Sequence, residues 1–93
     1  FHASSSYSSR ADVYYRDPNT LEESFVLSVA PNSEATGMGS PKNVDDFDVV
    51  VKSGGNVLPN GTKTHLSADN DTEQVDIAIF GNGSVTINVN PKN

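Results

Sequence analysis

Apolar and polar residues alternate with a period of two along much of this chain, which is typical of half-buried β-strands. The clearest alternation covers residues 75–80 and 84–90, and Gly81-Asn82-Gly83 stands between them. Glycine and asparagine adopt the backbone conformations that tight turns need. The stretch from 72 to 91 is therefore predicted to be a β-hairpin around which the rest of the core is arranged.

The length of the hairpin loop decides which side chains share a face, because directly opposed residues point to the same side of a sheet. A two-residue loop would split the apolar residues between the two faces. A three-residue loop sets Ile79 against Val85 and Ile77 against Ile87, and it gathers six apolar side chains on one face. We therefore predict the three-residue loop, with Gly83 in the left-handed conformation that closes such turns.

Further strands are expected between the N-terminal region and the hairpin. They cover residues 23–30, 44–52, 57–58 and 62–66, and turn signals such as the Pro-Asn-Gly at 59–61 separate them. In the first of them, Phe25, Leu27 and Val29 are expected to point inward. No segment shows a helical period. The pattern predicts an all-β fold, an immunoglobulin-like antiparallel β-sandwich of six or seven strands with a long extended N-terminal strand.

Residues 1–15 alternate over a much longer stretch than the five or six residues of a usual strand. Fully extended they would reach roughly 50 Å, whereas a domain of this length is about 30 Å across. We therefore divide the chain into an N-terminal arm at 1–15 and a β-sandwich domain at 16–93. One interpretation is a disordered Ser-rich tail at 1–10 followed by a short strand. The other is a donor strand that lies in the sheet of a neighbouring molecule, with its inward-facing side chains at Phe1, Ala3, Ser5, Tyr7, Ser9, Ala11, Val13 and Tyr15.

Composition limits the partners. Apolar residues make up 34% of the chain and there is no cysteine, so the core is lean and no disulfide reinforces it. A small domain of this kind is expected to gain stability from a partner chain, a bound ion or attached glycans. The net charge of −6 disfavours nucleic acid and anionic membrane surfaces as partners. The longest apolar runs are three residues, far too short for membrane insertion.

The residues offer little for catalysis, so we predict that the chain is not an enzyme. It has two histidines, no thiol and no serine in a Gly-x-Ser-x-Gly turn. Asp69, Asp71 and Glu73 place oxygen ligands at alternate positions of a turn, as in the opening of a calcium-binding loop. The glycine at the sixth position of such a loop and the glutamate at the twelfth are missing, so a solvated acidic turn without any cofactor is the alternative.

Three Asn-x-Ser/Thr sequons, at Asn60, Asn70 and Asn82, fall in predicted turns where an N-linked glycan has room. The first residue is Phe1 rather than methionine, which suggests a processed product. An extracellular or cell-surface location is therefore expected, and glycosylation depends on it.

These observations lead to two hypotheses of function. The first is a non-enzymatic extracellular subunit of a surface filament, in which copies of the chain are joined by donation of the N-terminal strand into the neighbour's sheet. Its logic resembles the strand donation used by pilins, and it would supply the apolar burial that the lean core lacks. The alternative is an adhesive or carbohydrate-binding module of a larger surface protein. Tyr14 and Phe80 have the alternation of outward residues and would provide its aromatic surface.

Overall fold

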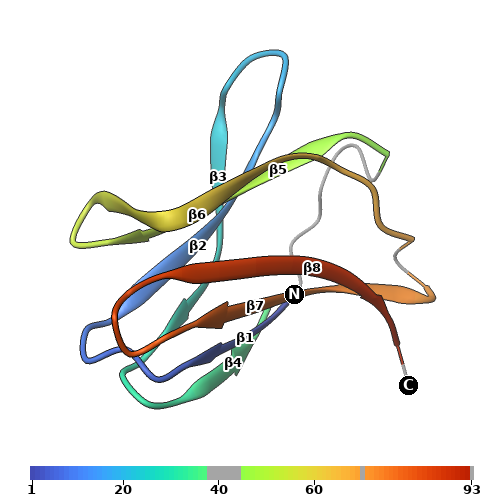
Figure 1. Ribbon diagram of the computed structural model, residues 1–93. Coiled ribbons are helices and arrows are strands. Elements are labelled where there is room, and N and C mark those ends of the chain that lie inside the picture. The colour runs from blue at the N-terminus through green and yellow to red at the C-terminus, as the bar shows by residue number, and fades with distance from the viewer. Residues whose placement is uncertain (38–44, 70, 93) are drawn as a thin grey trace.

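Two β-sheets pack against each other in the computed structural model, which describes residues 1–37, 45–69 and 71–92. Within these residues the chain has eight strands and no helix (Figure 1), which confirms the predicted all-β class. Sheet A has the strand order β4-β1-β7-β8, and sheet B has the order β3-β2-β5-β6. The strands are β1 (His2–Ser5), β2 (Ala11–Arg16), β3 (Glu23–Val29), β4 (Glu34–Thr36), β5 (Phe47–Ser53), β6 (Asn56–Leu66), β7 (Glu73–Ile79) and β8 (Val85–Pro91).

The predicted hairpin is confirmed, and it forms β7 and β8. Ile79 is opposite Val85 and Ile77 is opposite Ile87, as the three-residue loop requires. The Phe80 N–H donates to the Ser84 carbonyl at 2.9 Å, and Gly83 has a φ of 86° in the left-handed region. Alternation and turn chemistry agree over this short span, so local sequence was sufficient to set the register.

The core lies between the sheets and draws on both of them. Its largest fully buried side chains come from β2, β3, β5 and β7, and each contributes about 1.5–3 kcal/mol relative to an exposed position. Val89, at the far end of the hairpin, is partly buried against this cluster. The fully buried side chains of largest volume are Phe47, Ile77, Ile79, Val13, Val29, Val49, Val50 and Val51.

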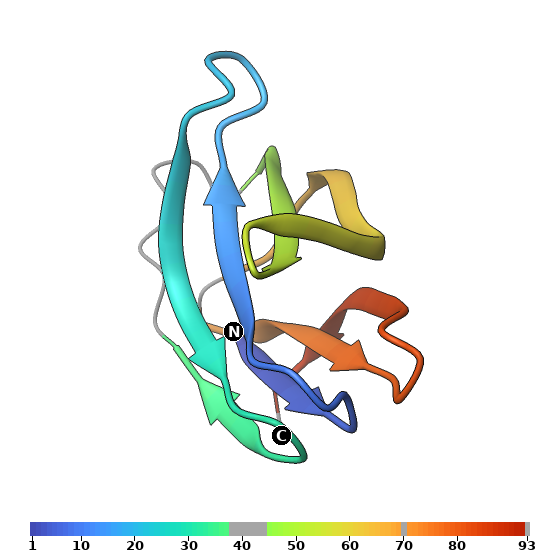
Figure 2. The same ribbon diagram turned by 90° about the vertical axis from the view of Figure 1, so that its left-hand side faces the viewer.

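The short strand expected after residue 10 is present as β2, whereas residues 1–10 fit neither interpretation of the sequence. Residues 1–15 do not form one long strand, because β1 ends at Ser5 in sheet A and β2 starts at Ala11 in sheet B. Figure 2 shows the chain crossing from one sheet to the other between them. β1 lies between β4, to which it is antiparallel, and β7, to which it is parallel, so sheet A is not purely antiparallel. The alternation predicted most of the buried positions correctly, with Ser9 as the exception, and β1 completes the chain's own sheet A.

A β-bulge in β3 reverses the predicted direction of Phe25. Val13 is opposite Leu27, but the next residue of β2, Tyr14, is opposite Phe25, so Val26 is an extra residue. On the far side of an extra residue, each side chain of the strand points to the opposite face of the sheet from the one that regular alternation predicts. Leu27 is therefore buried as predicted, while Phe25 is 60% exposed instead of pointing inward.

The turn signal at 59–61 does not end the strand as expected, because β6 continues through it as a single strand of 11 residues, although the pairing with β5 is interrupted there. The strand bends there, because Asn60 has a positive φ of 58° and the register with β5 shifts. A Cβ on Gly61 would lie 2.7 Å from the carbonyl oxygens of Leu58 and Val51. Glycine therefore permits a close backbone approach at this irregularity, and pairing with β5 resumes on both sides of it, at Val57 and at Thr62.

Each edge strand of the two sheets carries a feature that opposes pairing with another chain. β3 has the bulge at Val26, and β4 is only three residues long. β6 contains Pro59 and the irregular backbone just described. In β8, Lys63 Nζ donates to the Ile87 carbonyl at 2.8 Å and so occupies an edge acceptor. The described part of the chain therefore presents no long, regular edge.

Candidate ligand-binding face

Strands β2, β3 and β5 bring three side chains together on the outer surface of sheet B, and we refer to Tyr14, Phe25 and Lys52 as the aromatic face. The rings of Tyr14 and Phe25 meet edge to face, with their centroids 6.0 Å apart. Lys52 Nζ lies 5.0 Å from the centroid of the Tyr14 ring, within cation–π range. The same nitrogen donates to Glu23 Oε1 at 2.6 Å. Aromatic surface and paired charges thus lie side by side.

Packing against neighbouring side chains explains the position of Tyr14 better than it explains that of Phe25. Val50 also points to the outer side of sheet B, directly opposite Tyr14, yet it is only 1% exposed. Tyr14 therefore has an apolar neighbour to pack beside on this face. Phe25 remains 60% exposed and gains little from folding. An exposed ring supported by a second ring is therefore the feature of this face that packing does not explain.

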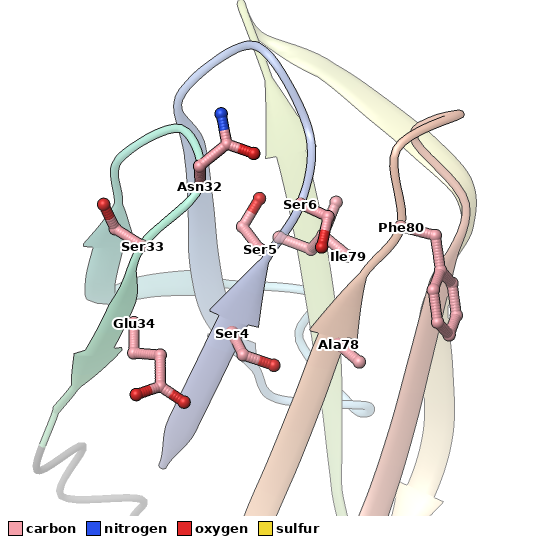
Figure 3. Close-up of a pocket in the computed structure, with 9 residues that line it drawn as sticks. All are labelled: Ser4, Ser5, Ser6, Asn32, Ser33, Glu34, Ala78, Ile79 and Phe80. Atoms are coloured by element: carbon pink, nitrogen blue, oxygen red, sulfur yellow. The ribbon is translucent and has the colours of Figure 1, made fainter.

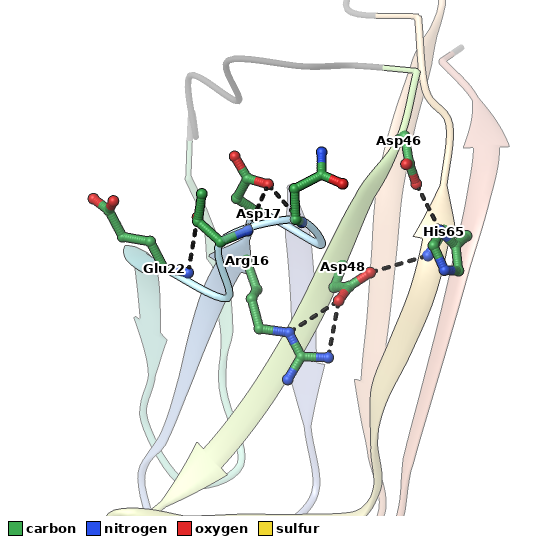
Figure 4. Close-up of polar contacts among 8 residues, drawn as sticks. Arg16, Asp17, Glu22, Asp46, Asp48 and His65 are labelled. Atoms are coloured by element: carbon green, nitrogen blue, oxygen red, sulfur yellow. Dashed lines mark hydrogen bonds and ion pairs between the residues drawn. The ribbon is translucent and has the colours of Figure 1, made fainter.

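A buried ion pair ties three strands of sheet B together beside the aromatic face (Figure 4). Arg16 Nε and Nη2 donate to Asp48 Oδ2 at 2.9 and 2.8 Å. Asp48 Oδ1 accepts the backbone N–H of His65 at 3.1 Å, so both carboxylate oxygens are satisfied. Asp48 is 2% exposed, and a charge buried to this degree is tolerated only with such partners. The pair holds β2, β5 and β6 in fixed relative positions.

His65 itself lies in solvent at the end of β6. Its Nδ1 is 2.8 Å from Asp46 Oδ1, and the hydrogen bond to this carboxylate raises the pKa of His65 above its usual value of 6.5. The negative charge of Asp46 acts in the same direction. His65 also has a positive φ of 55°, which the Asp48 hydrogen bond to its N–H helps to hold.

The two aromatic residues proposed from sequence as one sugar-binding surface lie on different sheets. Tyr14 belongs to β2 in sheet B, whereas Phe80 directly follows β7 of sheet A and is 48% exposed. Sequence reasoning missed Phe25 as the partner of Tyr14. The signal was the run of three apolar residues, Phe25-Val26-Leu27, because such a run cannot alternate and marks a position where a bulge fits.

The residues predicted to lie inward in the N-terminal strand are mostly buried in this chain's own core. Phe1 and Tyr7 are partly buried against it, and Ser9 is exposed. The ring centroid of Phe1 is 6.5 Å from that of Phe47. Its carbonyl accepts the Gly37 N–H at 3.0 Å. The fully or nearly fully buried positions are Ala3, Ser5, Ala11, Val13 and Tyr15.

The acidic turn binds its own backbone. The Asp69 N–H donates to Glu73 Oε1 at 3.0 Å, and the Asp71 N–H donates to Asp69 Oδ1 at 2.8 Å. No group of three or more His, Cys, Asp or Glu side chains among the described residues is arranged to hold a metal ion. Calcium binding at Asp69, Asp71 and Glu73 stays a prediction.

Two of the three sequons can be placed, since Asn70 lies outside the described residues. Asn60 is exposed on β6 rather than in a turn. Asn82 is exposed in the hairpin loop, as predicted, and its Oδ1 accepts hydrogen bonds from the Ser84 N–H at 3.0 Å and from the Ser84 hydroxyl at 2.7 Å. Both sites leave room for a glycan, and their occupancy stays a prediction.

Comparison with known proteins assigns no relative to this chain. No family model, no curated protein sequence and no solved structure matches it significantly. Among the residues that the structure describes, no helix has the length and apolarity needed to cross a bilayer. The function must therefore be argued from the surface geometry.

Proposed function

We propose that this chain is a non-enzymatic binding module, displayed extracellularly or on a cell surface, whose aromatic face binds a neutral polysaccharide. The observation that carries the proposal is Phe25, a large ring that is 60% exposed and is held edge to face by Tyr14 on a sheet of four strands. Single exposed rings are common in soluble domains, but Phe25 rests on a second ring that a lysine also contacts, and this gives a rigid apolar surface with polar groups at its border.

Neutral sugars suit this chemistry. The apolar C–H surface of a sugar ring packs on an aromatic ring, while sugar hydroxyls both donate and accept hydrogen bonds. Lys52 supplies donors and Glu23 supplies acceptors at the border of the rings. Anionic glycans suit it less, because the chain carries a net charge of −6 and Glu23 already neutralises Lys52.

The aromatic face is tested by affinity electrophoresis in gels that contain a neutral β-glucan or mannan. Phe25→Ala removes the exposed ring without opening the core, and we expect it to weaken retention roughly tenfold. Leu21→Ala is the control, because it removes a large apolar side chain that is 63% exposed and belongs neither to the aromatic face nor to sheet A, and it should leave retention unchanged. Equal retention of the Phe25→Ala variant and the parent chain would overturn the proposal. So would retention that appears only with anionic polymers.

We also assign the sandwich to the immunoglobulin-like class. In support, the chain passes between the sheets after β1, β3, β4 and β6, and such cross-sheet connections are typical of Greek-key sandwiches. Modules of this class occur as repeats of larger surface proteins, which is the setting we propose for this one.

Strand donation between copies of the chain is the second candidate function, in the form of an exchange of β1. One observation favours it: β1 fills a slot between β4 and β7, and the segment that follows it contains exposed residues at Ser6, Ser8, Ser9 and Arg10. A neighbour's β1 would make the same contacts in that slot. The features of β3, β4, β6 and β8 described above oppose pairing along the sheet edges. For the described part of the chain, an exchange of β1 is therefore the way to a homopolymer that we consider.

A disulfide separates the two arrangements, because the chain has no cysteine of its own. Ser4 is opposite Glu34 in the antiparallel β1–β4 pair, at a spacing that a disulfide can span. Oxidised Ser4→Cys/Glu34→Cys protein should run as a monomer on non-reducing gels if β1 stays in its own sheet. Exchange would give covalent dimers and longer chains from the same variant, and their absence at high protein concentration removes this candidate.

A further inference from the structure

Sheet A carries a pocket of about 360 Å³ on the opposite side of the molecule from the aromatic face. Figure 3 shows it where β1 and β7 end and β4 begins, next to the turn that joins β3 to β4. Asn32 and Ser33 of that turn form one wall. Phe80 also borders the pocket, but its ring lies on the side away from Ser33 and Glu34 (Figure 3).

Small side chains create the depression. Ser4 is opposite Glu34 on β4 and opposite Ala78 on β7, so these three residues form one row across the outer surface of sheet A. Ser4 and Ala78 in the middle of the row leave space, and Glu34 borders it. The backbone around the pocket is held by hydrogen bonds from the Ser5 N–H to the Ser33 carbonyl at 2.9 Å and from the Ser6 N–H to the Ile79 carbonyl at 2.8 Å.

Several polar side chains that line the pocket have no hydrogen-bond partner among the described residues. The hydroxyls of Ser4 and Ser6 and the amide of Asn32 make no side-chain hydrogen bond within the described part of the chain. The side chain of Glu34 is 72% exposed, and its Oε1 lies 3.8 Å from His2 Nε2, beyond hydrogen-bond distance. Donors and acceptors that the described residues leave unpaired therefore line the pocket.

We propose that this pocket binds a single neutral sugar residue, such as the end unit of a glycan. Serine hydroxyls and the asparagine amide both donate and accept hydrogen bonds, and the Glu34 carboxylate accepts them, which together complement adjacent sugar hydroxyls. The carboxylate opposes anionic ligands. A volume of about 360 Å³ is at the small end of the range for ligand pockets and suits one ring rather than an extended chain. The proposal goes beyond the function assigned to the aromatic face, because the pocket lies on the other sheet and shares no residue with it.

The test is an NMR titration of the ¹⁵N-labelled chain with the methyl glycosides of glucose, galactose and mannose. We expect amide shifts at Ser4, Ser6 and Asn32 with at least one of them. Ala78→Leu fills the depression and should lower the affinity at least tenfold, and Glu34→Gln, which keeps the size of the side chain, should lower it roughly tenfold. Thr86→Val is the control, because Thr86 is opposite Ala78 on β8 but does not line the pocket.

Shifts confined to other surfaces, or an affinity unchanged in both Ala78→Leu and Glu34→Gln, would overturn the proposal. Glu34→Gln keeps the test valid if the leucine disturbs the sheet, since Glu34 is an exposed edge residue. Phe25→Ala distinguishes the aromatic face from the pocket, because it should reduce retention on polysaccharide gels and leave the amide shifts at the pocket unchanged. Failure of one site is therefore distinguishable from failure of the other.

Discussion

The ion pair between Arg16 and Asp48 allows a sharp test of the packing described above. Arg16→Met keeps the length and apolar part of the side chain but removes both N–H donors from Asp48 Oδ2. The carboxylate is 2% exposed and would keep only the His65 N–H as a partner. The substitution therefore leaves a buried charge with half of its compensation.

The expected cost follows from this burial. Removing one partner of a buried pair typically costs about 3–5 kcal/mol. The Arg16 side chain is 22% exposed, so water can partly replace it, and we take the lower end, about 3 kcal/mol. For a domain of this size that lowers Tm by roughly 12–24 °C. It is also a large share of the 5–15 kcal/mol that usually stabilises a domain.

Thermal and urea unfolding followed by circular dichroism measure this difference. Glu23→Gln is the control, because it breaks the Lys52–Glu23 pair, which has a shorter N···O distance of 2.6 Å but side chains 24% and 29% exposed. It should cost less than about 1 kcal/mol. The double variant Arg16→Met/Asp48→Asn should be more stable than Arg16→Met alone, because it removes the stranded charge. A loss in Arg16→Met no larger than in Glu23→Gln would refute the reasoning.

Three further outcomes are expected from the same structure. Gly61→Ala should cost about 3 kcal/mol in urea unfolding, because its Cβ would meet two carbonyl oxygens at 2.7 Å, whereas Gly81→Ala, whose nearest neighbour is at 3.7 Å, should be close to neutral. The pKa of His65, followed by NMR, should be above 6.5 and should return toward that value in Asp46→Asn. Because the folded-state pKa is the raised one, the stabilisation by this contact is complete below the unfolded pKa and is lost as pH rises through the folded pKa. If the acidic turn at 69–73 binds calcium, Tm should rise with added calcium and fall with chelator, and a Tm indifferent to both would remove the site.

Alternation and turn residues predicted those parts of the fold that depend on neighbours in the sequence. The hairpin followed from alternation and from the glycine at position 83, because its two strands are adjacent and its loop is short. Alternation in residues 1–15 also predicted that Ala3, Val13 and Tyr15 are buried. It could not tell which strands would cover them, since a period of two specifies a buried face but not the partner of that face.

The candidate site was harder to predict because it depends on one extra residue. Phe25 and Tyr14 come together only since Val26 forms the bulge, and either alignment of Phe25-Val26-Leu27 keeps an apolar side chain inward. Pairing with β2 decides between them, and that information lies outside the segment. The strand through Gly61 is similar, because pairing with β5 on both sides of the turn signal makes one strand of two expected ones.

The bulge at Val26 bears on both proposed functions, which are ligand binding on a sheet face and assembly of copies of the chain. It interrupts the edge of sheet B, which opposes pairing of a second chain along β3, and it also turns Phe25 outward beside Tyr14. A strand built for polymerisation along its edge would gain from regular alternation, with Phe25 inward and the edge continuous. This chain has the opposite arrangement, since its edge is interrupted and its aromatic surface is on the face of the sheet. The geometry therefore favours recognition through a sheet face over assembly through a sheet edge.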